Sequence, residues 1–258
     1  MLLKDKIIFV TGAGRGMGRG IAEALAEAGA HVVVGDLAIE SVRETAALVE
    51  KQARQALALQ LNVTDPNSVN TAIAASVDRF GRIDGWVNNA GIVKMDAALD
   101  VTMSDWQRQM QVNVDGLFLC CQLAGQQMRG QTGGGTIVNI ASNAGKVGYK
   151  NMAAYNAGKA AVISITRSLA LEWAEHNINV NAVCPGGVDT PMLLGVAEFY
   201  AARFGGDPHE MVKTMKPNQM NRRIQPIEVG RVVAFLLSDQ AHIIRGQSIN
   251  IDGGDTPY

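Results

Sequence analysis

Cysteine and histidine are scarce in this chain. Three cysteines occur among 258 residues, none in a C-x-x-C pair, and an odd count argues against a disulfide framework. The four histidines are scattered and form no H-E-x-x-H motif, so we predict no metal site. We therefore expect Cys120, Cys121 and Cys184 to be buried thiols in a reducing compartment, which indicates a cytoplasmic protein.

An excess of charge of one sign and long apolar runs are also missing. The 23 basic and 24 acidic residues give a formal net charge of -1 without a sustained basic run, so nucleic acid is not an expected partner. No apolar stretch approaches the roughly 20 residues that a membrane helix needs. Residues 1–10 lack the long apolar segment of a secretory signal. The expected partner is a small molecule, with neither nucleic acid nor membrane.

What the chain does contain is an alternation of short β-branched runs and longer helical patterns. Near-continuous apolar strands that alternate with helices are typical of a parallel sheet covered on both faces. We predict an α/β fold, with one doubly wound, seven-stranded parallel sheet of the Rossmann type spanning residues 1–258 as a single domain. The expected strands are 6–10, 31–36, 56–62, 85–91, 135–142, 177–186 and 247–254. The expected helices are 16–28, 40–52, one that begins at Pro66 behind Asp65, 102–129, 152–175 and 226–237.

Residues 187–225 interrupt this order. They contain Pro191, Pro208 and Pro217, and apolar residues lie between these prolines and Gly195, Gly205 and Gly206. An irregular insertion of this length in a compact domain is usually a lid or a binding loop. We predict that this segment is a substrate lid.

A glycine-rich stretch, TGAGRGMGRG at residues 11–20, follows the first strand and opens the first helix. At this position an open α/β sheet binds phosphate through backbone N–H groups and a helix N-terminus. The spacing G-x-G-x-x-G is absent, and Met17 stands where a further glycine would be needed. Present instead are Thr11-Gly12, three residues that include Arg15, and then Gly16 and Gly18.

Asp36 bears on which dinucleotide this loop binds. It ends the second strand roughly 20 residues beyond the loop, where an acidic residue binds the adenosine ribose hydroxyls. A carboxylate there repels a 2′-phosphate and selects NAD over NADP. Arg15 argues the other way, because its guanidinium would pair with that phosphate. We give Asp36 more weight; its alternative role is to cap the following helix.

Tyr155 and Lys159 lie four residues apart on one predicted helix and therefore share a face. Ser142 ends the fifth strand at the carboxyl edge of the sheet, where ligands bind. At this point the chain resembles the classical short-chain dehydrogenases/reductases, in order and spacing over essentially its whole length. The motifs that carry the resemblance are Thr11-Gly12-x-x-x-Gly16-x-Gly18, Asn88-Asn89-Ala90-Gly91, Asn113, Ser142, Tyr155-x-x-x-Lys159 and Pro185-Gly186. Ala141 departs from the pattern, since many members have a second serine there.

The resemblance implies catalytic roles for four residues. Tyr155 would be the acid/base that exchanges a proton with the substrate hydroxyl, and Lys159 would lower the ordinary tyrosine pKa of about 10. Lys159 would also hold the nicotinamide ribose. Ser142 would bind the substrate oxygen, and Asn113 would hold a water that links Lys159 to solvent.

The resemblance further implies a cofactor cleft along the strand ends. At the glycine loop and the end of the second strand it assigns to the cofactor Gly12, Arg15, Gly16, Met17, Gly18 and Asp36. It places Asn62 and Val63 at the adenine, and Asn89, Ala90 and Gly91 in the cleft together with Tyr155 and Lys159. At the nicotinamide it places Pro185, Gly186, Val188 and Thr190. The family also implies a homotetramer, with helices 102–129 and 152–175 at a subunit interface.

These residues predict an NAD-dependent oxidoreductase acting on a secondary alcohol or its ketone. The segment SNAGKVGYKNMAAYN looks similar to that of polyol, diol and sugar-alcohol dehydrogenases. One alternative is a 3-oxoacyl-[acyl-carrier-protein] reductase that uses NADPH, with Arg129 and Arg167 docking the acidic carrier, although Asp36 argues against NADPH. Another is an NAD(H)-binding sensor without turnover, for which a complete acid/base set would be unnecessary.

Overall fold

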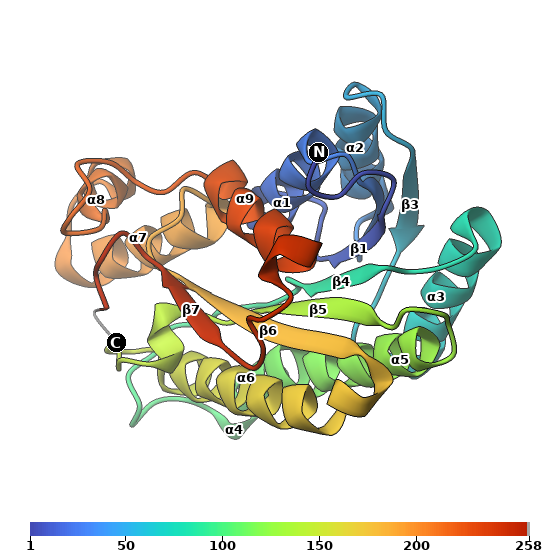
Figure 1. The fold of residues 1–258 in the computed structure, drawn as a ribbon. Helices are drawn as coiled ribbons and strands as arrows, with labels where there is room; N and C mark the ends of the chain where they lie inside the picture. The colour runs from blue at the N-terminus through green and yellow to red at the C-terminus, as the bar shows by residue number, and fades with distance from the viewer. Residues whose placement is uncertain (257–258) are drawn as a thin grey trace.

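The computed structural model describes residues 1–256 and arranges them in three layers, a parallel sheet between two layers of helices (Figure 1). The strand order is β3-β2-β1-β4-β5-β6-β7, which confirms the predicted seven-stranded, doubly wound sheet. The strands are β1 Ile7–Thr11, β2 His31–Asp36, β3 Ala56–Gln60, β4 Gly85–Asn88, β5 Gly135–Ile140, β6 Ile178–Pro185 and β7 Ser248–Ile251. Because the order reverses between β1 and β4, their carboxyl ends form the crevice in which open α/β sheets bind ligands.

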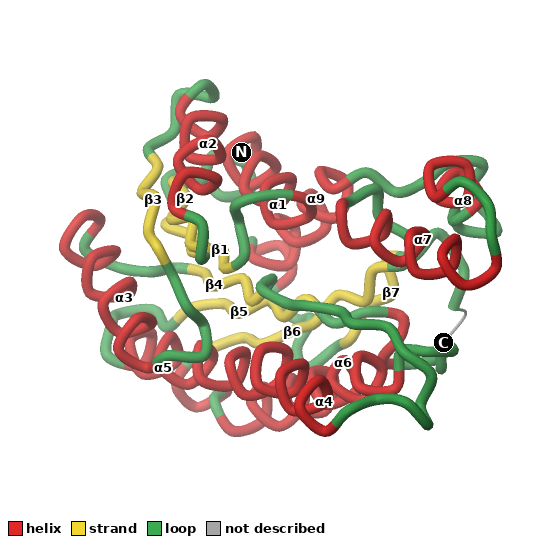
Figure 2. Tube along the Cα trace, turned by 180° about the vertical axis from the view of Figure 1, so that it is seen from behind, coloured by secondary structure: helices red, strands yellow, loops and turns green. Residues whose placement is uncertain are grey.

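The helices divide between the two faces of the sheet. The α-helices are α1 Gly16–Glu27, α2 Ile39–Glu50, α3 Pro66–Phe80, α4 Met103–Met110, α5 Leu117–Arg129, α6 Ala153–Glu172, α7 Pro191–Phe204, α8 Pro208–Thr214 and α9 Pro226–Leu237. Figure 2 shows α1, α2 and α9 on one side of the strands and α3, α5 and α6 on the other. Ile8 and Val10 of β1 pack into the first of these layers, and Phe9 packs into the second. Alternate side chains of each strand thus fill two separate cores.

Five expected strands end one to three residues earlier than the sequence pattern predicts. They end at residues 60, 88, 140, 185 and 251 rather than at 62, 91, 142, 186 and 254. The residues left over, among them Asn89, Gly91 and Ser142, form turns directly beyond the carboxyl edge. Because they are free of the ladder, their backbone and side-chain groups can serve a ligand.

The expected helix over residues 102–129 is not continuous. It consists of α4, a π-helical segment Gln111–Gly116, and α5. Short π-helical segments widen a helix locally and recur at functional sites. Here the segment contains Asn113, whose side chain is bonded to the backbone of Ile92. Helical periodicity alone does not reveal this insertion.

Residues 187–225 are also more regular than expected, because they contain α7 and α8. Thr190 and Asp207 cap these helices by accepting hydrogen bonds from Leu193 N and His209 N. Pro191 and Pro208 occupy the first helical turns, where a missing N–H costs nothing. Two of the three prolines that indicated an irregular segment are therefore helix starts, and Pro217 lies in the loop between α8 and α9.

The last glycine of the glycine-rich stretch serves packing between helices. A Cβ at Gly20 would lie 2.4 Å from the Cβ of Pro226, and a Cβ at Gly230 would lie 2.6 Å from the Cβ of Ala24. Glycines on both helices thus let α1 and α9 approach closely above the sheet. This contact fixes the axis of α1, and with it the direction of its N-terminus.

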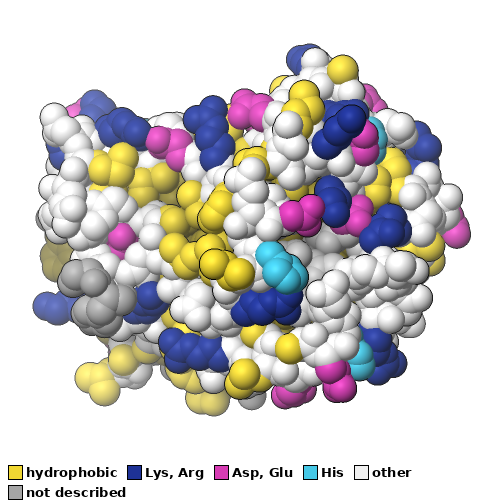
Figure 3. Space-filling view, in the orientation of Figure 1, with side chains coloured by type: hydrophobic (Ala, Val, Ile, Leu, Met, Phe, Trp, Pro, Cys, Tyr) yellow, Lys and Arg dark blue, Asp and Glu magenta, His cyan; other side chains and the backbone are white. Residues whose placement is uncertain are grey.

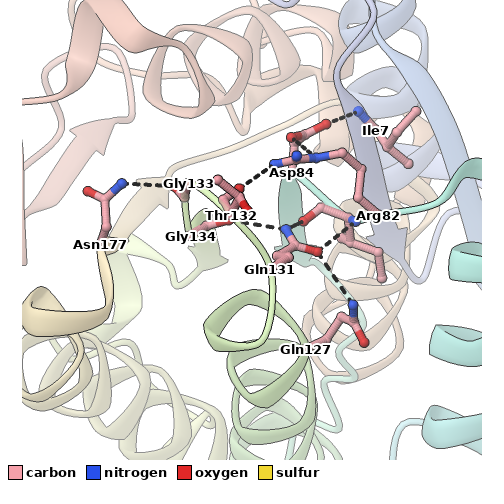
Figure 4. Close-up of polar contacts among 10 residues, drawn as sticks. Ile7, Arg82, Asp84, Gln127, Gln131, Thr132, Gly133, Gly134 and Asn177 are labelled. Atoms are coloured by element: carbon pink, nitrogen blue, oxygen red, sulfur yellow. Dashed lines mark hydrogen bonds and ion pairs between the residues drawn. The ribbon is translucent and has the colours of Figure 1, made fainter.

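A polar network ties the strands together at the opposite, amino edge of the sheet (Figure 4). The Asp84 carboxylate accepts hydrogen bonds from Ile7 N at 2.8 Å and from Arg82 Nε at 2.7 Å. The Gln131 side chain donates to the Ile83 carbonyl at 2.6 Å and accepts from Ile83 N at 3.3 Å. These bonds join β1, the start of β4 and the loop before β5, so they fix the register of the strands whose other ends carry the site.

Charged side chains of both signs are scattered over the face seen in Figure 3, in keeping with the balanced charge count. Within residues 1–256, each helix is too short or too polar to cross a membrane. Cys120, Cys121 and Cys184 are all buried free thiols.

Candidate active site

The turn from β1 into α1 lies directly against the end of β4. Gly12 has a φ of +62°, and a Cβ there would lie 2.7 Å from Ala90 Cα. A Cβ at Gly18 would lie 2.2 Å from the carbonyl oxygen of Gly12. Neither position has room for a larger residue, so these glycines fold the turn tightly and leave the N-terminus of α1 open. Such an N-terminus is a binding site for phosphate.

The loop is held in place by hydrogen bonds from the end of β4. Asn89 Nδ2 donates to the carbonyl oxygens of Thr11 and Gly12, both at 2.9 Å. Thr11 Oγ1 accepts hydrogen bonds from the backbone N–H groups of Asn89 and Ala90, both at 3.0 Å. The structure therefore brings Gly12, Gly18, Asn89 and Ala90 together as the motif implies. Sequence reasoning gave Thr11 no role of its own, although it precedes the glycines as the fixed first residue of the motif.

Asp36 turns its side chain toward the glycine loop. Asp36 Oδ2 accepts a hydrogen bond from Gly14 N at 3.0 Å, and Oδ1 accepts one from Leu37 N at 2.7 Å. The alternative role of Asp36 as a helix cap is wrong, because Ala38 precedes the first residue of α2. The N-terminus of α2 has no side-chain cap, and the Asp36 carboxylate is bonded to Gly14 N and Leu37 N instead.

The two arginines of the loop region lie in different surroundings. Arg15 is exposed at the start of α1. Arg19 donates to the Gly14 carbonyl at 2.7 Å and pairs with Glu44 Oε2 at 2.7 Å. The guanidinium of Arg19 is thus committed to α2, while that of Arg15 stays at the surface of the loop. Gly16 and Met17 are half-buried at the same helix start.

The predicted adenine and nicotinamide residues lie at the outer strand ends. Asn62 is exposed and its Oδ1 accepts from Thr64 N at 3.1 Å, whereas Val63 is buried in the core. Beyond β6, Val188 pairs with Ile224 in an isolated parallel bridge, and Thr190 caps α7. No hydrogen bond among the described residues links Asn62 to the glycine loop.

The segment Asn89–Gly91 connects the glycine loop to the predicted catalytic residues. A Cβ at Gly91 would lie 3.2 Å from Asn113 Oδ1 and 3.7 Å from Lys159 Nζ. The two neighbours of Gly91 on its N-terminal side are the residues that bind Thr11. The ammonium and the glycine loop therefore lie on either side of one short turn, at the crevice of the sheet.

Lys159 is 5% exposed, and its Nζ donates to the carbonyl oxygen of Ile140 at 2.7 Å. Its Nζ also lies 5.6 Å from the centroid of the Tyr155 ring. Ser142, two residues beyond Ile140, caps a short turn by accepting from Ala144 N at 3.1 Å. Thus α6 and the end of β5 bring Tyr155, Lys159 and Ser142 into one group.

Asn113 is almost completely buried on the π-helical segment. Its Oδ1 accepts from Ile92 N and its Nδ2 donates to the Ile92 carbonyl, both at 2.8 Å. Both ends of the amide are thus used to hold the residue that follows Gly91. Any water at Asn113 must therefore be held by its backbone or share these bonds.

Comparisons with known proteins agree with this geometry. A family model described as enoyl-(acyl carrier protein) reductase matches residues 12–256. The NAD-dependent glycerol dehydrogenase of Listeria innocua is 37% identical over 254 residues, covering 98% of this chain and 95% of that protein. The trans-4-hydroxycyclohexanecarboxylate dehydrogenase of Sinomonas cyclohexanicum is 36% identical over 258 residues (98% and 93%), and the meso-2,3-butanediol dehydrogenase of Serratia marcescens is 35% identical over 256 residues (99% and 96%).

The chain belongs to the short-chain dehydrogenase/reductase family. Solved structures give the same result: levodione reductase aligns with a TM-score of 0.91 at 33% identity, covering 98% of each chain. An actinorhodin polyketide ketoreductase variant with NADPH aligns with a TM-score of 0.90 at 33% identity, again over 98% of each chain. As a short-chain dehydrogenase/reductase, the protein is an NAD(P)-dependent oxidoreductase of CH–OH groups.

Burial controls the ionisation of the two titratable residues in this site. Burial lowers the pKa of Lys159 from 10.5 to about 8. Burial also raises the pKa of Tyr155 above its ordinary value, while a hydrogen bond with Ser142 acts in the opposite direction. The expectation that Lys159 lowers the pKa of Tyr155 is therefore wrong for the protein alone. In this short-chain dehydrogenase/reductase, loss of water around the phenol outweighs the hydrogen bond with Ser142.

The site can therefore hold a protonated phenol and a weakly basic amine next to a phosphate-binding turn. No cluster of three or more His, Cys, Asp or Glu side chains suitable for a metal ion occurs within residues 1–256. The groups that the structure brings together are those of proton transfer and oxygen binding.

Proposed function

We propose that this short-chain dehydrogenase/reductase uses NAD to interconvert a secondary alcohol and its ketone. The observation that carries the proposal is the position of Lys159, beside Gly91 and the Tyr155 ring and across the Asn89–Gly91 turn from the glycine loop. The residues of the loop fit a dinucleotide, because Gly12 and Gly18 leave the start of α1 open and Asp36 points at Gly14. When bound, the nicotinamide would supply the hydride acceptor or donor.

We propose the following division of labour among the chain's own residues. Tyr155 Oη exchanges the proton of the substrate hydroxyl, and Ser142 Oγ orients the substrate oxygen and stabilises the charge that develops on it. Lys159 anchors the sugar next to the nicotinamide and passes protons toward solvent. Asn113 holds Ile92 and thereby the Gly91 backbone against the ammonium.

We propose a polyol, a diol or a sugar alcohol as the substrate. The glycerol and meso-2,3-butanediol dehydrogenases among the relatives support this class by their names. A polar pair next to Ser142 fits it as well, since Asn143 Nδ2 donates to Tyr149 Oη at 2.8 Å. We propose residues 187–225 as the lid over this substrate, because Tyr200 of α7 reaches across to the Lys150 carbonyl at 3.4 Å.

A screen of purified protein against alcohols with NAD or NADP tests the proposal through the absorbance of the reduced nicotinamide. We expect reduction of NAD with at least one polyol or diol, faster at alkaline pH because Tyr155 must lose its proton for oxidation. Turnover confined to 3-oxoacyl thioesters with NADPH would instead favour the acyl-carrier reductase. Cofactor binding without turnover of any substrate in the screen would favour a sensor.

The Asp36→Ser variant tests the choice of cofactor. The ratio of kcat/KM with NAD to that with NADP is expected to fall about 10- to 100-fold, because the carboxylate that repels a 2′-phosphate is gone. Glu44→Ser is a matched control, since Glu44 is a carboxylate committed to Arg19. A wild-type enzyme that already prefers NADP would contradict the assignment of Asp36.

We propose a homo-oligomer, a tetramer by family resemblance, assembled through the groove between α5 and α6. The groove contains Phe118, Arg129, Glu172 and Trp173, and Phe118 is 42% exposed. Two copies related by a two-fold axis would set Arg129 of one against Glu172 of the other. Sedimentation is expected to show a smaller species for Arg129→Glu and restored assembly for Arg129→Glu/Glu172→Arg; unchanged assembly in both would place the interface elsewhere.

The three buried free thiols support a reducing, cytoplasmic location.

A further inference from the structure

A buried carboxylate just after β7 has no place in the mechanism above. Asp252 is 2% exposed, and its Oδ1 accepts a hydrogen bond from Gly254 N at 3.1 Å. Its Oδ2 is also buried and finds no hydrogen-bond partner within residues 1–256. A buried carboxylate oxygen without a donor is costly for the folded state, so its presence requires a reason.

Asp252 packs against the turn that follows β6. A Cβ at Gly186 would lie 2.8 Å from Asp252 Cβ and 3.1 Å from its Cα. Gly186 follows Pro185, the last residue of β6, and lies in the segment 185–190 that the family resemblance assigns to the nicotinamide. Asp252 therefore packs directly against the backbone of that segment. A side chain at position 186 would collide with Asp252, so only glycine allows this contact.

The charge of Asp252 acts on groups at both sides of the reaction centre. Burial raises the pKa of Cys184, which directly precedes Pro185, and Asp252 adds a small effect in the same direction, whereas the ammonium groups of Lys146 and Lys159 act in the opposite direction. Burial and then the Asp255 carboxylate raise the pKa of Tyr149, whose hydroxyl is bonded to Asn143 beside Ser142, and Asp252 adds a smaller effect in the same direction. Lys159 and Asp252 thus act in opposite directions on the side chain that directly precedes Pro185.

The two redox forms of the nicotinamide differ in charge, since the oxidised ring is a cation and the reduced ring is neutral. The buried Lys159 ammonium disfavours a second cation beside it. We propose that Asp252 offsets this repulsion and makes the protein bind oxidised nicotinamide cofactor in preference to reduced cofactor. This inference rests on the proposed function, because it assumes that segment 185–190 holds the nicotinamide. The oxidised cofactor is the hydride acceptor in alcohol oxidation. Tighter binding of this form would therefore favour the oxidation direction.

The Asp252→Asn variant tests the proposal by binding rather than by turnover. Calorimetric titration with NAD⁺ and with NADH, each alone, gives the two dissociation constants. The variant keeps the shape of the side chain and removes its charge, so the affinity for NAD⁺ is expected to fall about 10-fold while that for NADH changes by less than about 2-fold. Asp239→Asn is the control, because Asp239 is an exposed carboxylate that follows α9 at the amino edge of the sheet, where Leu237 lies against Gly85. It should shift the ratio of the two constants by less than about 2-fold.

Equal weakening of both forms, or no change in either, would overturn the role of Asp252 and leave the proposed function intact. A wild-type protein that binds neither form would overturn the proposed function itself. If Asp252→Asn does not fold, the wild type is titrated with an uncharged analogue of NAD⁺ that carries benzamide in place of nicotinamide. We expect NAD⁺ to bind about 10-fold more tightly than this analogue; equal or weaker binding of NAD⁺ would overturn the proposal.

Discussion

Replacing Tyr155 with phenylalanine is expected to lower kcat about 1,000-fold and to leave the affinity for cofactor nearly unchanged. General acid/base catalysis contributes roughly 100- to 10,000-fold to enzymatic rates, and phenylalanine removes the proton donor while keeping the ring. The ring stays in contact with Lys159, whose Nζ lies 5.6 Å from its centroid. Steady-state kinetics with the best alcohol of the screen and calorimetric titration with NAD measure the two effects separately.

Tyr149→Phe is the matched control for this experiment. Tyr149 is a second phenol near the site, is 39% exposed, and is bonded to Asn143 rather than to Ser142. Removing its hydroxyl is expected to change kcat by less than about 10-fold, since one hydrogen bond is lost and no proton donor. If Tyr155→Phe retained most of the activity, the acid would have to be another residue.

Replacing Lys159 with methionine is expected to lower kcat/KM about 100- to 1,000-fold, through weaker cofactor binding and slower proton transfer. The Lys159 ammonium donates a hydrogen bond to the Ile140 carbonyl oxygen at 2.7 Å and lies next to Gly91. Methionine fills that space and supplies no donor. Steady-state kinetics and a titration with NAD measure the loss, and an unchanged KM for NAD would contradict the role of Lys159 at the ribose.

The same variant is expected to be more stable than the wild type at neutral pH. The unfolded chain binds a proton at Lys159 up to pH 10.5, whereas burial in the folded state lowers that pKa to about 8. Below pH 8 the folded protein therefore carries the full cost of a buried ammonium, of order 1–3 kcal/mol. Between pH 8 and 10.5 folding releases a proton, so the stability of the wild type rises relative to that of Lys159→Met over this window.

Denaturant titrations of both proteins at pH 7 and pH 10 measure this difference. Lys146→Met is the control, since Lys146 Nζ also donates to a carbonyl, that of Ser248, at 2.7 Å. A Lys159→Met variant less stable than the wild type at pH 7, by more than the control, would mean that the ammonium supports the fold through bonds that outweigh its desolvation.

Much of the site was predictable because it follows from where strands end. Buried parallel strands are apolar over their whole length, so the polar residues that follow them, such as Asn89 and Ser142, mark the carboxyl edge. Tyr155 and Lys159 share a face because of helical spacing alone. The glycines that follow the first strand predicted a close approach to the backbone. The short contacts at Gly12 and Gly18 confirm it.

Other features depended on contacts that have no local signal. The π-helical segment contains Asn113, whose side chain is bonded to Ile92, which is 21 residues away along the chain. Pro191 and Pro208 begin helices because Thr190 and Asp207 cap them, and the same prolines would equally end a strand or shape a loop. The burial of Asp252 against Gly186 joins two segments that are 66 residues apart in the chain.

The sequence by itself determined the family and the sheet and indicated the residues that we propose for acid/base catalysis, since motif spacing and apolar periodicity are local properties of the chain. The tertiary structure decided the ionisation of those residues. Tyr155 was expected to be made acidic by its neighbour, but its pKa is raised, because the free energy of a charge depends on how much water the whole fold removes from it. No local sequence pattern specifies how much water is removed. That is decided only when β5, β6 and α6 pack around the site.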